Sequence, residues 1–209
     1  MNVSILIATY GEESWAQLAL TRALPSAQMQ DAHEVLIGHD PDATIAGTRN
    51  ALALQAHGDW LCFLDADDEL GANYLGAMRR AWERAGGEDG TPRLLTPAVV
   101  QIINGRKRGP HFFDRGKPLS DDNWLVVGTL VERKLFFEVD GFSDYPHGFE
   151  DWSLWAKCWR AGAEIVKVED AIYYAHWNRN SKHHQAWRNR REQVEMHQRI
   201  RRELFPELT

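Results

Sequence analysis

The residues best suited to chemistry are two aspartates that directly follow an apolar run. Asp65-Ala66-Asp67 comes immediately after residues 60–64. Two carboxylates at positions i and i+2 beyond a buried strand can approach one hard divalent cation, which prefers oxygen ligands. Such a cation would neutralise a diphosphate. The alternative is a solvated acidic turn, because acidic residues are common where strands end.

Polar residues also follow the first two apolar runs of the chain. Thr9-Tyr10-Gly11 ends the first run, and His39-Asp40-Pro41-Asp42 follows the second. Ligands of open α/β sheets bind beyond the carboxyl ends of the strands, so we expect these clusters to meet the acidic pair. The chain contains neither the G-x-G-x-x-G fingerprint nor the G-x-x-x-x-G-K-[ST] phosphate loop. A glycine cradle is therefore not how phosphates are held here.

The hydropathy pattern predicts the elements that position these clusters. Residues 3–9 form a continuous β-branched and apolar run, which is typical of a strand covered on both faces. Short strands that alternate with helices imply right-handed crossovers and an open α/β sheet. The predicted order is strand 3–9, helix 14–27, strand 34–38, helix 45–57, strand 60–64 and helix 72–85.

The second half of the chain is less regular. We find no internal repeat and no linker, so we expect one α/β domain with an open mixed sheet and a Rossmann-like N-terminal half. The predicted elements are strand 94–103, a turn at Asn104-Gly105, a polar loop 106–118, strand 126–131, helix 150–161, strands 165–168 and 172–175, and an amphipathic helix 185–204.

Composition narrows the class of protein. The 209 residues are 44% hydrophobic, enough for one good core, and the formal net charge of −6 argues against a surface built wholly for nucleic acid or anionic lipid. The apolar runs fall short of the roughly 20 residues that a membrane span requires. With no secretory signal pattern at the N-terminus, we expect a cytoplasmic protein, at most peripheral at a membrane surface. Cys62 and Cys158 lie in apolar segments and are predicted to be buried thiols.

Taken in order, the motifs resemble those of the family-2 glycosyltransferases with the A-type fold. The N-terminal motifs are VSILIATY at 3–10, AGTRN at 46–50 and GDWLCFLDADD at 58–68. Downstream, Gly141-Phe142, GFEDWSLW at 148–155, Gly162 and YYAH at 173–176 are similar to the family's acceptor-side segment and closing strand. The resemblance covers residues 1–180 and divides them into a nucleotide-sugar-binding half, 1–103, and an acceptor-side half, 104–180. Residues 181–209 follow as a basic C-terminal helix.

The resemblance implies a nucleoside-diphosphate sugar donor, most naturally a UDP-sugar, and a divalent metal, Mn²⁺ or Mg²⁺. One departure concerns the nucleobase: the family often has two acids after the second strand, and this chain has His39-Asp40 followed by Pro41. The residues implied to bind the donor are Thr9, Tyr10, Asp40, Arg49, Asp65 and Ala66, with Asp67 and His176 as metal ligands.

The resemblance further implies an inverting displacement in which a carboxylate takes the proton of the attacking acceptor hydroxyl. We predict Asp151 as that base, with Glu150 beside it to bind acceptor or orient the loop. The alternative is that both acids merely favour a helix N-terminus. Trp152 would offer an acceptor sugar or a base its ring face, whereas Trp155 and Trp159 are predicted to face the core.

The C-terminal end is locally basic. It could meet an anionic acceptor, either a lipid-linked glycan at a membrane or a nucleic acid such as a hydroxylated DNA base, or it could be a solvated helix face. A saccharide or lipid-linked acceptor is the main expectation. The residues concerned are Arg179, Lys182, Arg188, Arg190, Arg191, Arg199, Arg201 and Arg202, interleaved with Trp177, His183, His184 and Trp187.

Two other classes of protein compete with a glycosyltransferase. A non-catalytic nucleotide-sugar-binding module would have no reason to keep Asp65, Asp67 and Asp151 together. A nucleotidyltransferase ordinarily has a Gly-rich N-terminal loop with basic residues, whereas Glu12 and Glu13 here would repel a triphosphate.

Overall fold

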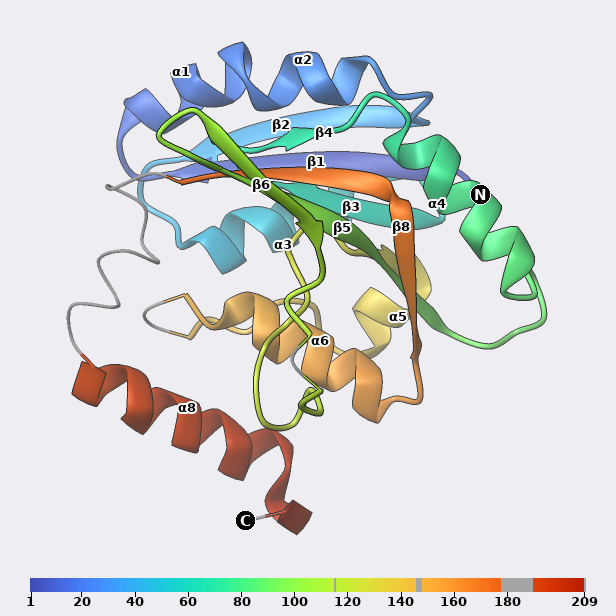
Figure 1. The fold of residues 1–209 in the computed structure, drawn as a ribbon. Coiled ribbons are helices and arrows are strands. Elements are labelled where there is room, and N and C mark those ends of the chain that lie inside the picture. Colours follow the sequence, from blue (N-terminus) through green and yellow to red (C-terminus); the bar gives the residue numbers. More distant parts are fainter. Residues whose placement is uncertain (115, 146–147, 178–189, 209) are drawn as a thin grey trace.

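The computed structural model describes residues 1–114, 116–145, 148–177 and 190–208. Within them, one sheet runs in the order β2-β1-β3-β7-β5-β8-β4, with β6 paired to β5 (Figure 1). The strands are β1 Val3–Tyr10, β2 Glu34–Asp40, β3 Trp60–Leu64, β4 Glu69–Leu70, β5 Arg93–Ile103, β6 Arg106–His111, β7 Leu130–Glu132 and β8 Glu164–His176. The helices are α1 Glu13–Thr21, α2 Ala23–Gln28, α3 Ile45–Gln55, α4 Tyr74–Arg84, α5 Arg133–Glu138, α6 Glu150–Arg160 and α8 Arg190–Leu204, followed by the short η1 Pro206–Leu208.

The N-terminal half has the predicted parallel arrangement. β1 pairs in parallel with both β2 and β3, so the three strands end at the same edge of the sheet. Figure 1 shows α1 and α2 on one face of these strands and α3 on the other. Six consecutive residues of β1, from Ser4 to Thr9, are buried, as expected for a strand covered on both faces.

The second half makes the sheet mixed. β7 runs antiparallel to β3 and β5, whereas β8 lies parallel to β5. The open mixed sheet predicted from the sequence is therefore confirmed.

Several predicted boundaries are wrong. Residues 106–111 form strand β6 rather than a loop, because Asn104 and Gly105 both adopt positive φ and turn the chain back onto β5. The two predicted strands 165–168 and 172–175 are one strand, β8, and the predicted strand 126–131 shrinks to β7. The predicted helix 14–27 is split at Arg22, since Pro25 within a continuous helix would clash with the carbonyl of residue 21.

The core extends from the sheet to the C-terminal end. Ile200 and Phe205 are fully buried, and α8 packs against α6. Both cysteines are free and buried, as predicted, and burial raises the pKa of each thiol to about 12. No helix in the described part of the chain is long and apolar enough to cross a membrane.

Candidate active site

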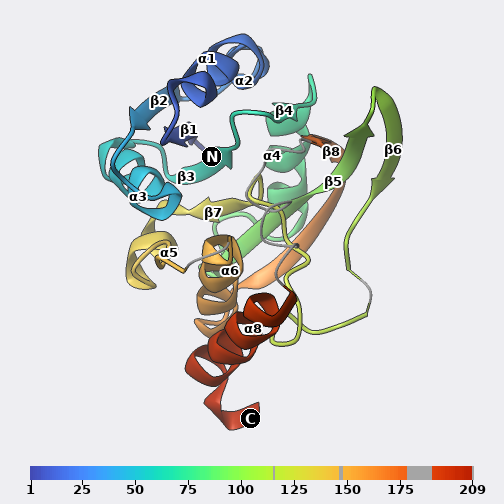
Figure 2. The ribbon, with the colours of Figure 1, turned by 90° about the vertical axis from the view of Figure 1, so that its left-hand side faces the viewer.

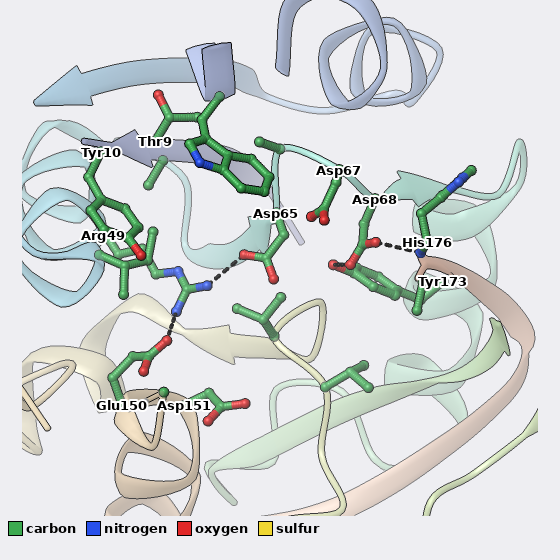
Figure 3. A pocket seen from close by; sticks show the side chains of 18 of the residues that line it. Thr9, Tyr10, Arg49, Asp65, Asp67, Asp68, Glu150, Asp151, Tyr173 and His176 are labelled. Atoms are coloured by element: carbon green, nitrogen blue, oxygen red, sulfur yellow. Dashed lines mark hydrogen bonds and ion pairs between the residues drawn. The ribbon is translucent and has the colours of Figure 1, made fainter. Parts of the chain in front are cut away.

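A cavity of about 610 Å³ opens beyond the carboxyl ends of β1 and β3, where the sequence predicts the ligand (Figure 3). Its walls come from both halves of the chain, and most of the predicted site residues, though not Asp40 or Trp152, line it. The lining includes Thr9, Tyr10, Arg49, Asp65, Ala66, Asp67, Asp68, Asn123, Glu150, Asp151, Tyr173, His176 and Trp177.

Arg49 joins the two halves of the site. The N-terminus of α3 is capped by Thr44, whose hydroxyl accepts from the Gly47 amide, and Arg49 lies one turn further on. Its Nη2 lies 2.6 Å from Asp65 Oδ1 and its Nη1 lies 3.0 Å from Glu150 Oε1 (Figure 3). The Arg49 side chain is only 5% exposed. Burial opposes its charge, but the two carboxylates outweigh burial and raise the pKa of Arg49.

These ion pairs define the roles of two predicted residues. The resemblance implies that Arg49 meets either the pyrophosphate or the acidic loop, residues 65–68, and in this structure it contacts Asp65 of that loop. Glu150 is buried and faces Arg49 rather than the middle of the cavity, and its second oxygen has no hydrogen-bond partner among the described residues. In this structure Glu150 is therefore engaged by the Arg49 guanidinium.

Asp151 lines the cavity with both carboxylate oxygens hydrogen-bonded. Its Oδ2 accepts a hydrogen bond of 3.0 Å from the Asn123 side chain, and its Oδ1 accepts one of 2.7 Å from the Trp152 amide. Burial and the neighbouring charge of Glu150 raise the pKa of Asp151 to about 7, against the opposing effect of Arg49. A carboxyl group with a pKa near neutrality can both hold and release a proton under physiological conditions.

Asp68 fastens the acidic loop to β8. This buried carboxylate accepts hydrogen bonds from the Tyr173 hydroxyl at 2.8 Å and from the His176 amide at 2.7 Å. Burial, together with the charges of Asp67 and Asp65, raises the pKa of Asp68 well above its usual range. The His176 ring, at the end of β8, lies 2.6 Å from the carboxylate of Glu69 in β4.

Of the residues predicted to bind the nucleotide, Thr9 and Tyr10 line the cavity and Asp40 does not. Thr9 and Tyr10 line the cavity, and the Thr9 hydroxyl hydrogen-bonds the His39 ring at 3.0 Å. Asp40 is not among the lining residues: its exposed carboxylate accepts from the amides of Asp42 and Ala43 and so closes the turn after β2. The structure does not bring Asp40 together with the other donor candidates.

The prediction that Trp152 stacks on an acceptor is wrong. Its side chain is 1% exposed, donates to the Leu119 carbonyl at 2.7 Å and packs against His197 of α8. No ring face remains for a ligand. Trp155 is buried as predicted, but Trp159 is 39% exposed and does not belong to the core stripe.

The residues fit a metal that is held jointly with a diphosphate. Among the described residues, no group of three or more His, Cys, Asp or Glu side chains could hold a metal ion by itself. Asp67 and His176 line the cavity, but the His176 ring is already engaged by Glu69, as Asp65 is by Arg49. Mg²⁺ is commonly bound by one or two carboxylates plus substrate phosphates, which is the donor set available here.

Three arginines of the basic C-terminal helix form ion pairs within the described residues. Arg191 pairs with Glu195, Arg199 with Glu203 and Arg201 with Asp121. These contacts favour the solvated helix face among the two interpretations of this segment. Arg179, Lys182, His183, His184, Trp187 and Arg188 lie outside the described residues.

Comparison with known proteins identifies the fold. No family model and no curated protein sequence matches the chain. Among solved structures, residues 1–349 of S. aureus TarS in complex with UDP-GlcNAc match with a TM-score of 0.72 and 16% identity over 96% of this chain. The same fragment in complex with UDP matches with a TM-score of 0.65 and 17% identity over 90% of this chain.

The chain spans 65% and 64% of the length of those two TarS structures, and 38% of a longer TarS structure that it matches with a TM-score of 0.64. The predicted A-type glycosyltransferase fold is confirmed by these matches.

Proposed function

We propose that this protein is a glycosyltransferase that moves a sugar from a UDP-sugar to an acceptor hydroxyl, with inversion at the anomeric carbon and with help from a divalent metal. The observation that carries the proposal is the position of Asp151. A carboxyl group whose pKa is raised to about 7 shares one cavity with the Asp65–Asp67 loop of an A-type fold.

The donor side is supported by the fold and by the charges around β3. TarS, with the same fold, is described in complexes with UDP-GlcNAc and UDP. In this chain Thr9 and Tyr10 stand at the end of β1, where they would meet the nucleotide, and Arg49 holds Asp65 ready for the sugar or ribose. The Arg49 contact sets the orientation of Asp65 before a donor arrives, which reduces the entropy lost on binding.

The acceptor side is supported by the surroundings of Asp151. An attacking hydroxyl has a pKa far above neutrality, so its proton must leave as the new bond forms. Asn123 and the Trp152 amide hold the two oxygens of Asp151 in one orientation. The remaining lone pairs are then available to the hydroxyl. Attack from this side, opposite the departing diphosphate, gives an inverted product.

The leaving diphosphate accumulates negative charge in a cavity that is already acidic. A divalent cation would offset that charge as a Lewis acid. Asp67 is the residue we assign to hold it. Asp65 and His176 would join as further ligands only by giving up their contacts with Arg49 and Glu69. Since this donor set is incomplete without phosphate oxygens, tight metal binding should require a nucleotide.

The test is donor hydrolysis and transfer with UDP-GlcNAc and Mn²⁺. We expect release of UDP, not of inorganic pyrophosphate, which separates a glycosyltransferase from a nucleotidyltransferase. Asp151→Asn should lower kcat for transfer by about 10²–10⁴-fold while leaving UDP affinity intact. Asp67→Ala should abolish the dependence of UDP affinity on Mn²⁺.

A matched control is Asp170→Asn, which alters an exposed carboxylate of β8 outside the cavity. It should behave as wild type. If Asp151→Asn turns over as fast as this control, Asp151 is not the base. If the wild type binds UDP but shows no turnover, the protein is a non-catalytic binding module.

A further inference from the structure

The loop of residues 119–127, which we call the cavity loop, connects the cavity with the C-terminal helix α8. Leu119 and Ser120, at the start of the loop, are buried, so it belongs to the packed structure. Figure 2 shows α8 beside α6, the helix that carries Asp151. Four residues of the loop line the cavity: Asn123, Leu125, Val126 and Val127.

Two side chains of α8 hold the cavity loop at Asp121. The Nε2 atom of His197 lies 2.8 Å from the Asp121 carbonyl oxygen. Because a carbonyl oxygen only accepts, this nitrogen carries a proton and donates it. One turn further along the helix, Arg201 Nη2 lies 3.0 Å from Asp121 Oδ1. Asp121 is thus bound through both its backbone and its side chain.

The same loop reaches Asp151 two residues further on. The Asn123 side-chain amide donates to Asp151 Oδ2 at 3.0 Å, and its carbonyl oxygen accepts from the Leu125 amide at 3.2 Å. Both ends of the Asn123 side chain are engaged, so its position depends on the position of the loop. A displacement of the loop would move this donor away from Asp151.

Trp152 joins the same assembly from α6. Its indole donates to the Leu119 carbonyl at 2.7 Å, and its ring centre lies 4.7 Å from that of His197. Its backbone amide donates to Asp151 Oδ1 at 2.7 Å. The residue that follows Asp151 is therefore packed against the helix that also holds the cavity loop.

We propose, building on the glycosyltransferase function above, that Arg201 and His197 are positioning residues for Asp151 and act through the cavity loop. The contacts run from these two residues to Asp121, and from Asn123 to Asp151. A general base must lie within hydrogen-bond reach of the group that it deprotonates. A carboxylate that turns freely therefore loses rate without loss of affinity for the donor.

The ion pair of Arg201 suits this role better than it suits stability. The side chains of Arg201 and Asp121 are 33% and 41% exposed, and partly exposed ion pairs contribute little to the free energy of unfolding. The C-terminal segment is instead anchored by Ile200 and Phe205, which are fully buried. The ion pair can therefore be removed while the packing of α8 stays.

The first experiment measures UDP-GlcNAc hydrolysis with Mn²⁺. We expect Arg201→Gln to lower kcat by about tenfold, with KM for UDP-GlcNAc changed less than twofold. Arg201→Lys, which keeps the charge, should retain most of the rate. The matched control is Arg191→Gln, which breaks an ion pair with Glu195 that lies wholly within α8, and it should behave as wild type. Urea unfolding should be the same for both glutamine variants.

The second experiment repeats Arg201→Gln in the Asp151→Asn background. It should cause no further loss there, because the base through which Arg201 acts is already absent. An equal further loss in this background would mean a general effect on the fold and would overturn the proposal. Hydrolysis by Arg201→Gln at the rate of Arg191→Gln would overturn it too.

A third measurement does not depend on turnover. The Asp151 carboxyl carbon, identified by its loss in Asp151→Asn, is titrated by ¹³C NMR. A hydrogen bond to the ionised form lowers a pKa, so weakening the Asn123 contact by Arg201→Gln should move this titration to higher pH by about half a pH unit. The charges that act on Asp151, those of Glu150, Arg49 and Asp65, stay in place in this variant. An unchanged titration would overturn the proposal.

The underlying function is tested separately by hydrolysis in the wild-type protein. Absence of wild-type hydrolysis would contradict the proposed function, and the NMR titration would still decide whether α8 acts on Asp151. Normal wild-type hydrolysis that Arg201→Gln leaves unchanged would contradict only the role of α8.

Discussion

At the scale of single residues, the site depends on one guanidinium shared by two carboxylates. Arg49 holds Asp65 on the donor side and Glu150 on the acceptor side, and Glu150 in turn sets the charge beside Asp151. The three acids would repel one another without the cation between them. Loss of Arg49 would therefore affect both substrates at once.

The pKa of Asp151 predicts the pH dependence of transfer. The base acts only as a carboxylate, so kcat/KM should fall about tenfold per pH unit below a pKa of about 7 and level off above it. Glu150→Gln removes the adjacent negative charge that raises this pKa, and the inflection should move to lower pH by about one unit. The measurement is a pH–rate profile, with Glu169→Gln, an exposed acid of β8, as control. An inflection at an unchanged pH would show that the charge of Glu150 does not raise the pKa of Asp151.

The sequence identifies the acidic residues of the site but not all of their partners. Asp65, Asp67 and Asp151 are recognisable because they follow a strand or begin a helix within ordered motifs. Asp68 and Asn123 escape notice because their roles come from contacts with residues 105 and 28 positions away. Trp152 is misassigned for a related reason: which side of α6 is buried is decided by packing against distant segments, including Leu119 and His197.

At the scale of elements, Asp68 ties the loop after β3 to the end of β8. The loop carries Asp65 and Asp67, and the strand carries Tyr173 and His176, so a single buried carboxylate sets the spacing between the two walls of the cavity. The acidic loop is therefore held by packing as well as by Arg49.

Tyr173→Phe should reveal this connection. It removes the hydroxyl that donates to buried Asp68, and an unsatisfied buried acceptor costs about 1–3 kcal/mol of the free energy of unfolding. Urea denaturation would measure the loss. Tyr174→Phe, on the opposite face of the same strand, should cost less than about 0.5 kcal/mol. Equal effects of the two substitutions would show that Asp68 does not depend on the hydroxyl.

Elements are predictable where the sequence carries an apolar run or a helical hydrophobic period, and they are missed where it carries neither. β1, β2, β3 and α6 follow their patterns to within a few residues. β6 has no apolar alternation because its side chains are exposed, and it becomes a strand only through pairing with β5. The composition of residues 106–111 alone does not show that they pair with β5.

At the scale of the whole molecule, the C-terminal segment belongs to the packed structure. Phe205 is buried and its ring lies 5.9 Å from that of Trp159. Phe205→Ala should lower the free energy of unfolding by about 3–5 kcal/mol, because it leaves a cavity under η1. Thermal unfolding would measure this, with Leu54→Ala, whose side chain is 70% exposed, as control. An unchanged Tm for Phe205→Ala would show that residues 190–208 do not contribute to the stability of the packed core.

Strand β6 also affects solubility, because it lies at an edge of the sheet. Among the described strands β6 pairs only with β5, so its outer side is a sheet edge with free backbone donors and acceptors. Three consecutive cations and Pro110 discourage another chain from joining that edge. Neutral substitutions of Arg106 and Arg108 would therefore promote self-association through this edge. Charge-reversing substitutions would keep a charge there and so keep the molecules apart.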